Sequence, residues 1–223
     1  MKRDEPGIHF IRVRKVKTLE RANQGDAGLD FFFPEDLTVM DLLKANSHPK
    51  TDKPFDYIME REIDVEVARM PGEYYNPLTL QSGDVITAIR MQPLSRILIP
   101  SGIRVLLGPI GSMLQANNKS GVSTQKGLIF GAEVVDSPYV GEVHISLINV
   151  SKHVPVIRAG EKLVQFVHVP VFQTVPNEIA PELYESYAKH WGTRGTGGFC
   201  SSGDGLDMEE ELKLRDAQNG NDR

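Results

Sequence analysis

The chain has 223 residues, of which 40% are hydrophobic, so it can bury one sizeable core or two small ones. A formal net charge of −5 argues against a broad nucleic-acid or membrane surface, and no apolar run approaches the ~18 residues of a membrane span. The single cysteine, Cys200, excludes an internal disulfide framework, and the first residues lack the apolar stretch of a secretory signal. We therefore expect a cytoplasmic protein, in the host cytoplasm if the source is a virus.

The N-terminal half begins with a strand pattern and continues into a segment of different character. Residues 8–16, IHFIRVRKV, alternate apolar and polar side chains, which predicts a strand. A glycine-rich turn and three phenylalanines follow. Residues 41–80 are rich in proline and charge, with only short apolar stretches. We interpret them as an insertion, with a short helix near 38–45 and then a hairpin or arm.

The remainder of the chain is dominated by short β-type segments. They are rich in β-branched residues, are separated by turn signals at intervals of roughly 8–12 residues, and favour an all-β sandwich or barrel. The segments are 84–91, 95–108, 127–135, 141–150 and 154–172. Helical spacing is found only in 180–190 and 206–215, and the acidic residues 204–223 predict a disordered tail.

Asp136 is the first candidate for chemistry. It ends an apolar run directly before the turn Ser-Pro-Tyr-Val-Gly, and a carboxylate held at such a junction can serve as a general base. It could equally cap the turn. Tyr139 follows three residues later, where its ring could lie over a pocket floor or pack at the edge of the sheet.

Three further segments could bind phosphate groups. Lys119, Ser120 and Gly121 place a cation, a hydroxyl and a glycine side by side, which suits a phosphate oxygen or an ordinary polar loop. Gln165 lies in an otherwise apolar strand, where it must satisfy backbone groups or reach a ligand. Residues 193–203, TRGTGGFCSSG, have the composition of a lid or a flexible linker.

The lid interpretation gives each distinctive side chain of residues 193–203 a task. Arg194 can donate two hydrogen bonds to a terminal phosphate, and Ser201 and Ser202 offer further donors. Phe199 can stack on a planar base, with Cys200 directly after it. The glycines let the backbone approach a ligand closely.

Taken in order, five segments resemble the five motifs of the homotrimeric dUTPases. They are DAGLDFFFPED, NNKSGVSTQKG, GAEVVDSPYVGE, GEKLVQF and RGTGGFCSSG, and the resemblance covers about residues 8–203 apart from the 41–80 insertion. It implies a jelly-roll-like β-barrel over residues 1–190, a lid at 191–203 and the tail at 204–223. It also implies a homotrimer whose three active sites are shared between subunits. The reaction would be hydrolysis of dUTP to dUMP and pyrophosphate, with Mg²⁺ carried on the triphosphate.

The resemblance also implies a role for each candidate residue. Asp136 would activate the attacking water, Tyr139 would lie beneath the deoxyribose, and the backbone from Val135 to His144 would read the uracil edge. Phosphate contacts would come from Lys119, Ser120, Gly121 and Gln165. In the lid, Arg194, Ser201 and Ser202 would clamp the γ-phosphate, while Phe199 would stack on the base. Asp30 would lie near the phosphate and metal, acting through water or a neighbouring cation and not as a direct metal ligand.

Several positions depart from the family pattern. Lys119 stands where an arginine is usual, Glu133 and Cys200 replace glycines, and Pro138 and Val140 replace an acid and an arginine around Tyr139. These changes and the 41–80 insertion motivate one alternative, a nucleotide-gated regulatory relative that binds a protein partner. The other alternative is dCTP deaminase, but the catalytic glutamate that it would require is not found after Glu142.

Overall fold

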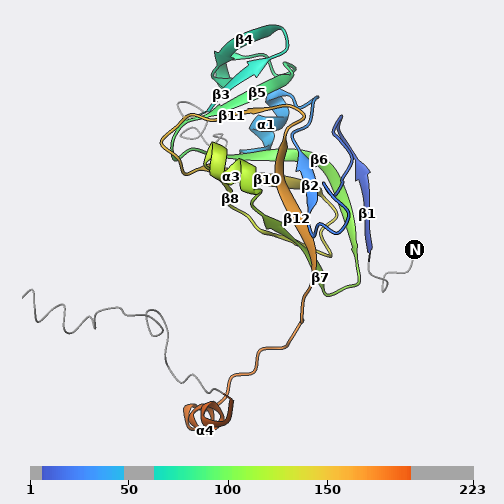
Figure 1. The fold of residues 1–223 in the computed structure, drawn as a ribbon, viewed down its shortest axis with the longest axis vertical. Coiled ribbons are helices and arrows are strands. Elements are labelled where there is room, and N and C mark those ends of the chain that lie inside the picture. The colour runs from blue at the N-terminus through green and yellow to red at the C-terminus, as the bar shows by residue number, and fades with distance from the viewer. Residues whose placement is uncertain (1–6, 48–62, 192–223) are drawn as a thin grey trace, which may run out of the picture. The chain divides into compact units, whose positions relative to one another are not determined.

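The computed structural model describes residues 7–47 and 63–191 (Figure 1). The chain divides into two compact units, residues 1–173 and 174–223. Within the described part, the first unit holds twelve strands: β1 (Gly7–Arg12), β2 (Leu29–Phe32), β3 (Ile63–Val67), β4 (Met70–Tyr75), β5 (Ile86–Met91), β6 (Arg96–Gly108), β7 (Ser112–Asn117), β8 (Leu128–Phe130), β9 (Val134–Asp136), β10 (Glu142–Asn149), β11 (Val156–Arg158) and β12 (Lys162–Pro170). Its helices are α1 (Val39–Ala45), α3 (Ser120–Lys126) and the 3₁₀ turn η1 (Pro77–Thr79).

The strands form three four-stranded antiparallel sheets around one core. The strand orders are β1-β6-β10-β8, β11-β5-β3-β4 and β2-β12-β7-β9. Phe31 and Phe166 meet inside with ring centroids 4.5 Å apart, and Phe130 packs edge-on against Phe166. β10 alternates half-buried and buried residues along its whole length, as a strand with one face on the core should. The predicted all-β, barrel-like fold is confirmed.

The segment interpreted as an insertion contains the predicted helix and hairpin; α1 and β3 add buried residues to the core, whereas β4 is exposed or half-buried. α1 begins at a capping box formed by Thr38 and Asp41, and its Leu42 is fully buried. Asn46 ties the end of α1 to β6, because its side chain donates to Leu98 O at 2.8 Å and accepts from Leu98 N at 2.9 Å. β3 lies between β5 and β4 in its sheet, with alternate residues buried. β3 therefore belongs to the core and forms the predicted hairpin with β4; residues 48–62 lie outside the described part.

The second unit contains α4 (Pro181–Trp191), in agreement with the helical spacing of residues 180–190. None of its residues is buried, and the rings of Tyr187 and Trp191 stack on one another. The first compact unit ends at Gln173, earlier than the predicted barrel boundary at residue 190. The helix expected at 206–215, the lid and the acidic tail lie outside the described residues. No helix in the described part of the chain has the length and apolar character that a bilayer crossing requires.

Candidate active site

Asp30 and Gln165 are brought side by side by strand pairing. Asp30 on β2 is opposite Gln165 on β12, and Gln165 is opposite Asn117 on β7. Asn117 is followed by Asn118, Lys119 and α3. The first, second and fourth motif segments therefore meet at one place in the sheet β2-β12-β7-β9.

Asp30 is a buried carboxylate held between two lysines. Its side chain is 2% exposed, and its oxygens lie 2.5 Å from Lys119 Nζ and 2.6 Å from Lys162 Nζ. Burial by itself would raise the pKa of Asp30, but the hydrogen bonds and charges of the two lysines outweigh it and lower that pKa. Asp30 therefore contacts two neighbouring cations, Lys119 and Lys162. Both of its oxygens face ammonium groups, which leaves neither as a natural ligand for a metal ion.

Lys162 is a site residue that sequence reasoning missed. It lies in the GEKLVQF segment, three residues before Gln165, and its side chain is 37% exposed. The sequence feature that could have indicated it is a lysine at the start of a strand that is otherwise rich in apolar residues. Asp30 raises the pKa of Lys162, mainly through their hydrogen bond, so this ammonium stays charged. Together with Lys119 it gives this end of the site two cations and one carboxylate.

Gln165 satisfies a backbone group and packs against a glycine. Its Nε2 donates to Asn118 O at 3.2 Å. A Cβ at Gly28 would lie only 2.5 Å from Gln165 Oε1, so only glycine at position 28 leaves room for this side chain. The Asn118 side chain in turn accepts a hydrogen bond from Phe130 N at 2.8 Å. The segment before α3 is therefore anchored on both sides.

The stretch from Ser120 to Lys126 forms a short helix where sequence reasoning considered a polar loop. Lys119 occupies the N-cap position without making a side-chain cap, and Thr124 Oγ1 donates to Ser120 O at 2.5 Å. Gly127 ends the helix with φ of 65°, a conformation that favours glycine. Because no side chain caps its start, α3 directs the backbone at Ser120 and Gly121 outward without a competing side-chain acceptor.

Asp136 lies at the end of β9, opposite Met113 of β7, and its side chain is exposed in the single chain. Its carbonyl accepts a hydrogen bond from Tyr139 N at 3.0 Å, which closes the turn. Val135, the residue before it, is half-buried against the core. The strand-to-turn junction predicted for Asp136 is therefore present. The exposed position of the carboxylate leaves it accessible to a substrate or to another subunit.

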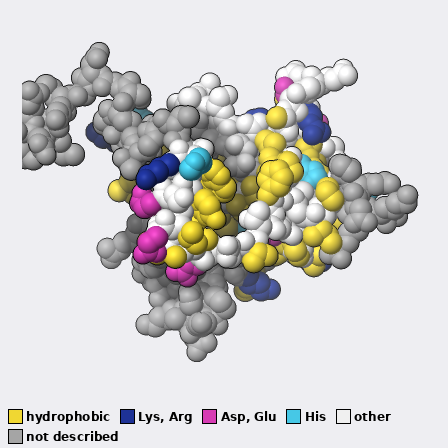
Figure 2. Space-filling view, turned by 90° about the horizontal axis from the view of Figure 1, so that it is seen from below, with side chains coloured by type: hydrophobic (Ala, Val, Ile, Leu, Met, Phe, Trp, Pro, Cys, Tyr) yellow, Lys and Arg dark blue, Asp and Glu magenta, His cyan; other side chains and the backbone are white. Residues whose placement is uncertain are grey.

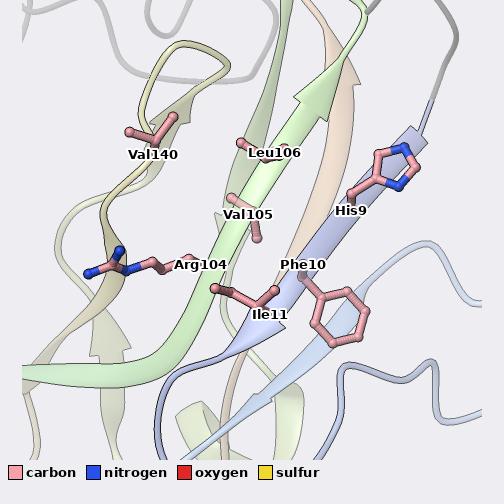
Figure 3. Close-up of a pocket in the computed structure, with 7 residues that line it drawn as sticks. All are labelled: His9, Phe10, Ile11, Arg104, Val105, Leu106 and Val140. Atoms are coloured by element: carbon pink, nitrogen blue, oxygen red, sulfur yellow. The ribbon is translucent and has the colours of Figure 1, made fainter. Parts of the chain in front are cut away.

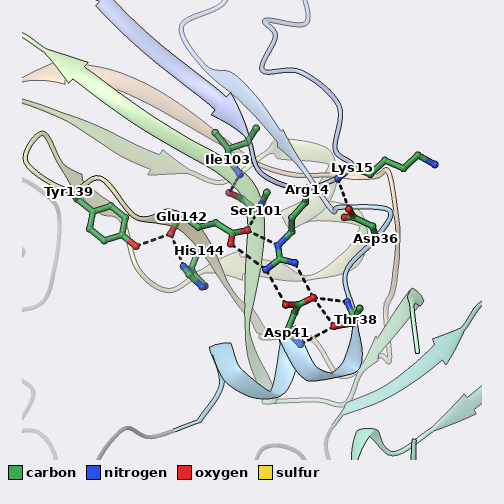
Figure 4. A network of polar contacts seen from close by, with 11 residues as sticks. Arg14, Lys15, Asp36, Thr38, Asp41, Ser101, Ile103, Tyr139, Glu142 and His144 are labelled. Atoms are coloured by element: carbon green, nitrogen blue, oxygen red, sulfur yellow. Dashed lines mark hydrogen bonds and ion pairs between the residues drawn. The ribbon is translucent and has the colours of Figure 1, made fainter. Parts of the chain in front are cut away.

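Tyr139 packs across its own turn (Figure 4). Its hydroxyl donates to Glu142 O at 2.8 Å, and His144 Nδ1 lies 2.8 Å from the same oxygen. A Cβ at Gly141 would lie 2.4 Å from Tyr139 Oη, so glycine is needed beneath the phenol. The turn thus does not require the ion pair that Pro138 and Val140 remove. Glu133, another departure, is exposed, and its backbone carbonyl accepts from Ala116 N at 2.7 Å.

The two halves of the candidate site lie far apart in one chain. Asp136 pairs with Met113, whereas Asp30 aligns through Gln165 with Asn117, four residues further along β7. Three strand spacings also separate β9 from β2. With about 3.4 Å per residue and about 4.8 Å per strand, the separation is about 20 Å. That distance exceeds the span between the α- and γ-phosphates of a nucleotide.

Two surface pockets lie away from these residues. One, of about 400 Å³, is lined by His9, Phe10, Ile11, Arg104, Val105, Leu106 and Val140 (Figure 3). The other, of about 370 Å³, is lined by Gly7, Ile8, Phe10, Leu19, Arg21, Leu29 and His168. Neither is lined by Asp136, Asp30, Lys119 or Gln165. Hydrophobic side chains also gather on the face shown in Figure 2.

Some predicted features cannot be located in the described residues. The lid residues Arg194, Phe199, Cys200, Ser201 and Ser202 lie outside residues 7–47 and 63–191. Within those ranges, no three His, Cys, Asp or Glu side chains gather in a way that could hold a metal ion.

Antiparallel sheets around one aromatic core define an all-β, barrel-like protein. A family model described as dUTPase matches residues 90–203, about half of the chain. A deoxyuridine 5'-triphosphate nucleotidohydrolase of Wolbachia pipientis (strain wPip) is 34% identical over 158 residues, which cover 65% of this chain and 99% of that protein. One from Maricaulis maris is 38% identical over 108 residues, covering 48% of this chain and 66% of that protein. The chain belongs to the dUTPase family.

Solved structures agree with this fold. The dUTPase of Staphylococcus bacteriophage 80alpha, solved with dUPNHPP, has a TM-score of 0.54 and 18% identity, with 88% of this chain and 98% of that chain covered. The dUTPase from phage phi11 of S. aureus has a TM-score of 0.50 and 16% identity, covering 78% and 96%. At these identities the likeness bears on the fold alone.

Proposed function

We propose that this protein hydrolyses dUTP to dUMP and pyrophosphate. Besides family membership, the observation that carries the proposal is the turn between β9 and β10 (residues 137–141), which follows Asp136 at the end of β9 and in which the Tyr139 phenol lies against Gly141. Asp136 would accept a proton from the water that attacks the α-phosphorus. Tyr139 would support the deoxyribose and clash with a ribose 2′-hydroxyl, and the backbone from Val135 to His144 would bind the uracil edge.

The phosphate end of the substrate would bind where Lys119, Lys162 and Gln165 meet. Asp30 holds both ammonium groups in place. The two lysine side chains remain partly exposed, so their ammonium groups could also bind phosphate oxygens. Ser120 and Gly121 would add contacts at the start of α3. Because both Asp30 oxygens face lysines, the described residues do not fit a metal ion held by the protein. We include Mg²⁺ as part of the substrate, bound to the triphosphate.

A homotrimer with shared sites is part of the proposal. The Cα atoms of Asp136 and Asp30 are about 20 Å apart when counted along the paired strands, which supports it, because the α- and γ-phosphates of one nucleotide lie much closer together. The pocket of about 400 Å³ that Ile11 and Val140 line also offers apolar surface for a neighbouring subunit, since Ile11 is 59% and Val140 62% exposed. Asp136 of one subunit would then face the lysines of another.

In the cell, the proposed activity would limit the incorporation of uracil into DNA and supply dUMP for dTMP synthesis. The cytoplasmic location expected from the sequence stays a prediction.

The proposed lid predicts a clear effect of truncation. A chain that ends at His190 keeps the first compact unit and all of α4 except the exposed Trp191, so its free energy of unfolding should be unchanged. Its kcat/KM for dUTP should fall by at least about 100-fold, since the cation and donors that enclose the triphosphate are lost. Pyrophosphate release and urea unfolding measure the two quantities. A chain that ends at Gly203 is the matched control and should retain activity; equal activity of the shorter chain would contradict the lid.

The proposed function is tested with dUTP, dCTP, dTTP and UTP in the presence of Mg²⁺. Pyrophosphate should be released from dUTP and only weakly from the other three nucleotides. Rapid UTP hydrolysis would contradict the role of Tyr139. Ammonia release from dCTP would identify a deaminase instead, and tight dUTP binding without turnover would favour a regulatory protein.

A further inference from the structure

Arg14 connects α1, which lies between β2 and β3, to the start of β10, directly after the turn between β9 and β10 (residues 137–141). It follows β1, and its guanidinium lies between two carboxylates: Nε is 2.8 Å from Glu142 Oε1 and Nη1 is 2.9 Å from Asp41 Oδ2 (Figure 4). Both pairs are mostly buried, with side-chain exposures of 19% for Arg14 and 15% for Glu142. A guanidinium that is shared in this way is fixed in orientation as well as position.

Glu142 lies where the backbone pairing between β10 and β6 is irregular. The register between β10 and β6 shifts here, because Glu142 is opposite Arg104 whereas His144 is opposite Pro100. Within this irregularity, Gly102 N donates to Glu142 Oε1 at 2.7 Å. A side-chain carboxylate therefore replaces a missing rung of the ladder. β9 pairs with β7, whereas β10 pairs with β6 and β8, so the turn between β9 and β10 is not fixed by pairing of these two strands with each other.

The backbone carbonyl of Glu142 also contacts the turn between β9 and β10. Glu142 O accepts the Tyr139 hydroxyl and lies 2.8 Å from His144 Nδ1. Displacing Glu142 would therefore shift the tyrosine ring and the turn that holds Asp136. The side chain of Glu142 contacts Arg14, and its carbonyl contacts the turn. A shift of Arg14 would therefore move the turn as well.

Asp41 completes the arrangement from α1. Its Oδ2 accepts hydrogen bonds from Thr38 N at 3.1 Å and Thr38 Oγ1 at 2.7 Å, so the helix cap orients it. Burial by itself would raise the pKa of Asp41, but the hydrogen bonds from Thr38 and the charge of Arg14 outweigh it and lower that pKa. Leu42 and Asn46 anchor α1 in the core. Asp41 therefore holds Arg14 from a helix that is itself fixed in the core.

We infer that Glu142, oriented by Arg14 and Asp41, is a positioning residue that sets the placement of Asp136 and Tyr139 for the reaction. This inference rests on the proposed function. It gives the α1 part of the 41–80 segment a role in catalysis. The helix is the rigid element that holds Arg14, and through Arg14 and Glu142 the turn between β9 and β10, in position. The Glu142 side chain would contact neither the water nor the nucleotide.

The test compares Glu142→Gln and Arg14→Met with the wild-type protein. Because a displacement of about 1 Å in a catalytic group can cost about 100-fold in rate, kcat for dUTP should fall by about 10- to 100-fold, with KM changed much less. Arg14→Lys, which keeps the charge but not the fork, should recover part of the loss. The double variant should be no slower than the slower single variant, because both act through one contact.

Asp84→Asn is the matched control. Asp84, just before β5, forms a 2.8 Å ion pair with Arg69 in the turn between β3 and β4, so its loss should lower the free energy of unfolding without changing kcat of the folded protein. Hydrogen exchange of the backbone amides in residues 137–144 supplies a second readout, which should quicken in Glu142→Gln but not in Asp84→Asn. Wild-type kcat and unchanged exchange in Glu142→Gln would overturn the inference alone. A wild-type chain without activity on dUTP would overturn the proposed function and the inference with it.

Discussion

Asp136→Asn is expected to lower kcat for dUTP by about 10²- to 10⁴-fold, the range that a positioned general base supplies. Asparagine has nearly the same shape but cannot accept the proton of the attacking water. Because the side chain is exposed and makes no contact that holds the strand, folding and nucleotide affinity should change little. Pyrophosphate release measures kcat, and binding of a non-hydrolysable α,β-imido analogue measures affinity. Glu66→Gln, a change of a carboxylate on β3, is the control; full activity of Asp136→Asn would refute its assignment as the base.

The same variant tests whether sites are shared between subunits. Ser120→Glu should also be inactive, because a carboxylate at the start of α3 repels phosphate while favouring the helix. If each site takes Asp136 from one subunit and Ser120 from another, random co-assembly of the two inactive variants restores about a quarter of the sites. Activity should therefore reappear on refolding the two chains together. No recovery would mean that both residues act within one chain.

Asp30→Asn is expected to lower the free energy of unfolding by about 2–4 kcal/mol. Removing one partner of a buried ion pair leaves charges uncompensated, and here two lysines lose their carboxylate. The partial exposure of both lysines limits the loss. Urea unfolding measures it. Glu35→Gln, which removes the exposed Lys15–Glu35 pair at 2.9 Å, is the control and should change little. An unaltered midpoint for Asp30→Asn would mean that the two lysines do not need this carboxylate.

The pH dependence of that difference has a definite sign. The lysines lower the pKa of Asp30 below its value in the unfolded chain, so ionised Asp30 stabilises the fold above the unfolded-state pKa of about 3.9. The contribution is lost as the pH falls through the lower folded-state pKa. The wild-type protein should therefore lose its advantage over Asp30→Asn as the pH is lowered below about 4. A constant difference between pH 7 and pH 3 would contradict the ion-pair explanation.

Local patterns along the chain were enough to predict much of the architecture. Alternation of apolar and polar residues predicted a strand at 8–16, where the structure has β1 over Gly7–Arg12. The content of β-branched residues predicted β10, and the spacing of apolar residues predicted α4. The order of the five motif segments predicted the family, and the junction at Asp136 was visible as an apolar run that meets a turn. Such features depend on neighbours within a few residues, so a single sequence displays them directly.

The ion pairs of the candidate site depend on folding, because they join residues that are distant along the chain. Lys162 meets Asp30, and Arg14 meets Glu142, only because antiparallel strands bring their segments together. With 25 basic and 30 acidic residues, the sequence offers far too many possible pairs for composition to select these. The incorporation of β3 into the barrel likewise follows from its pairing with β5. Strand register, set by packing of the whole core, determines which charges face one another.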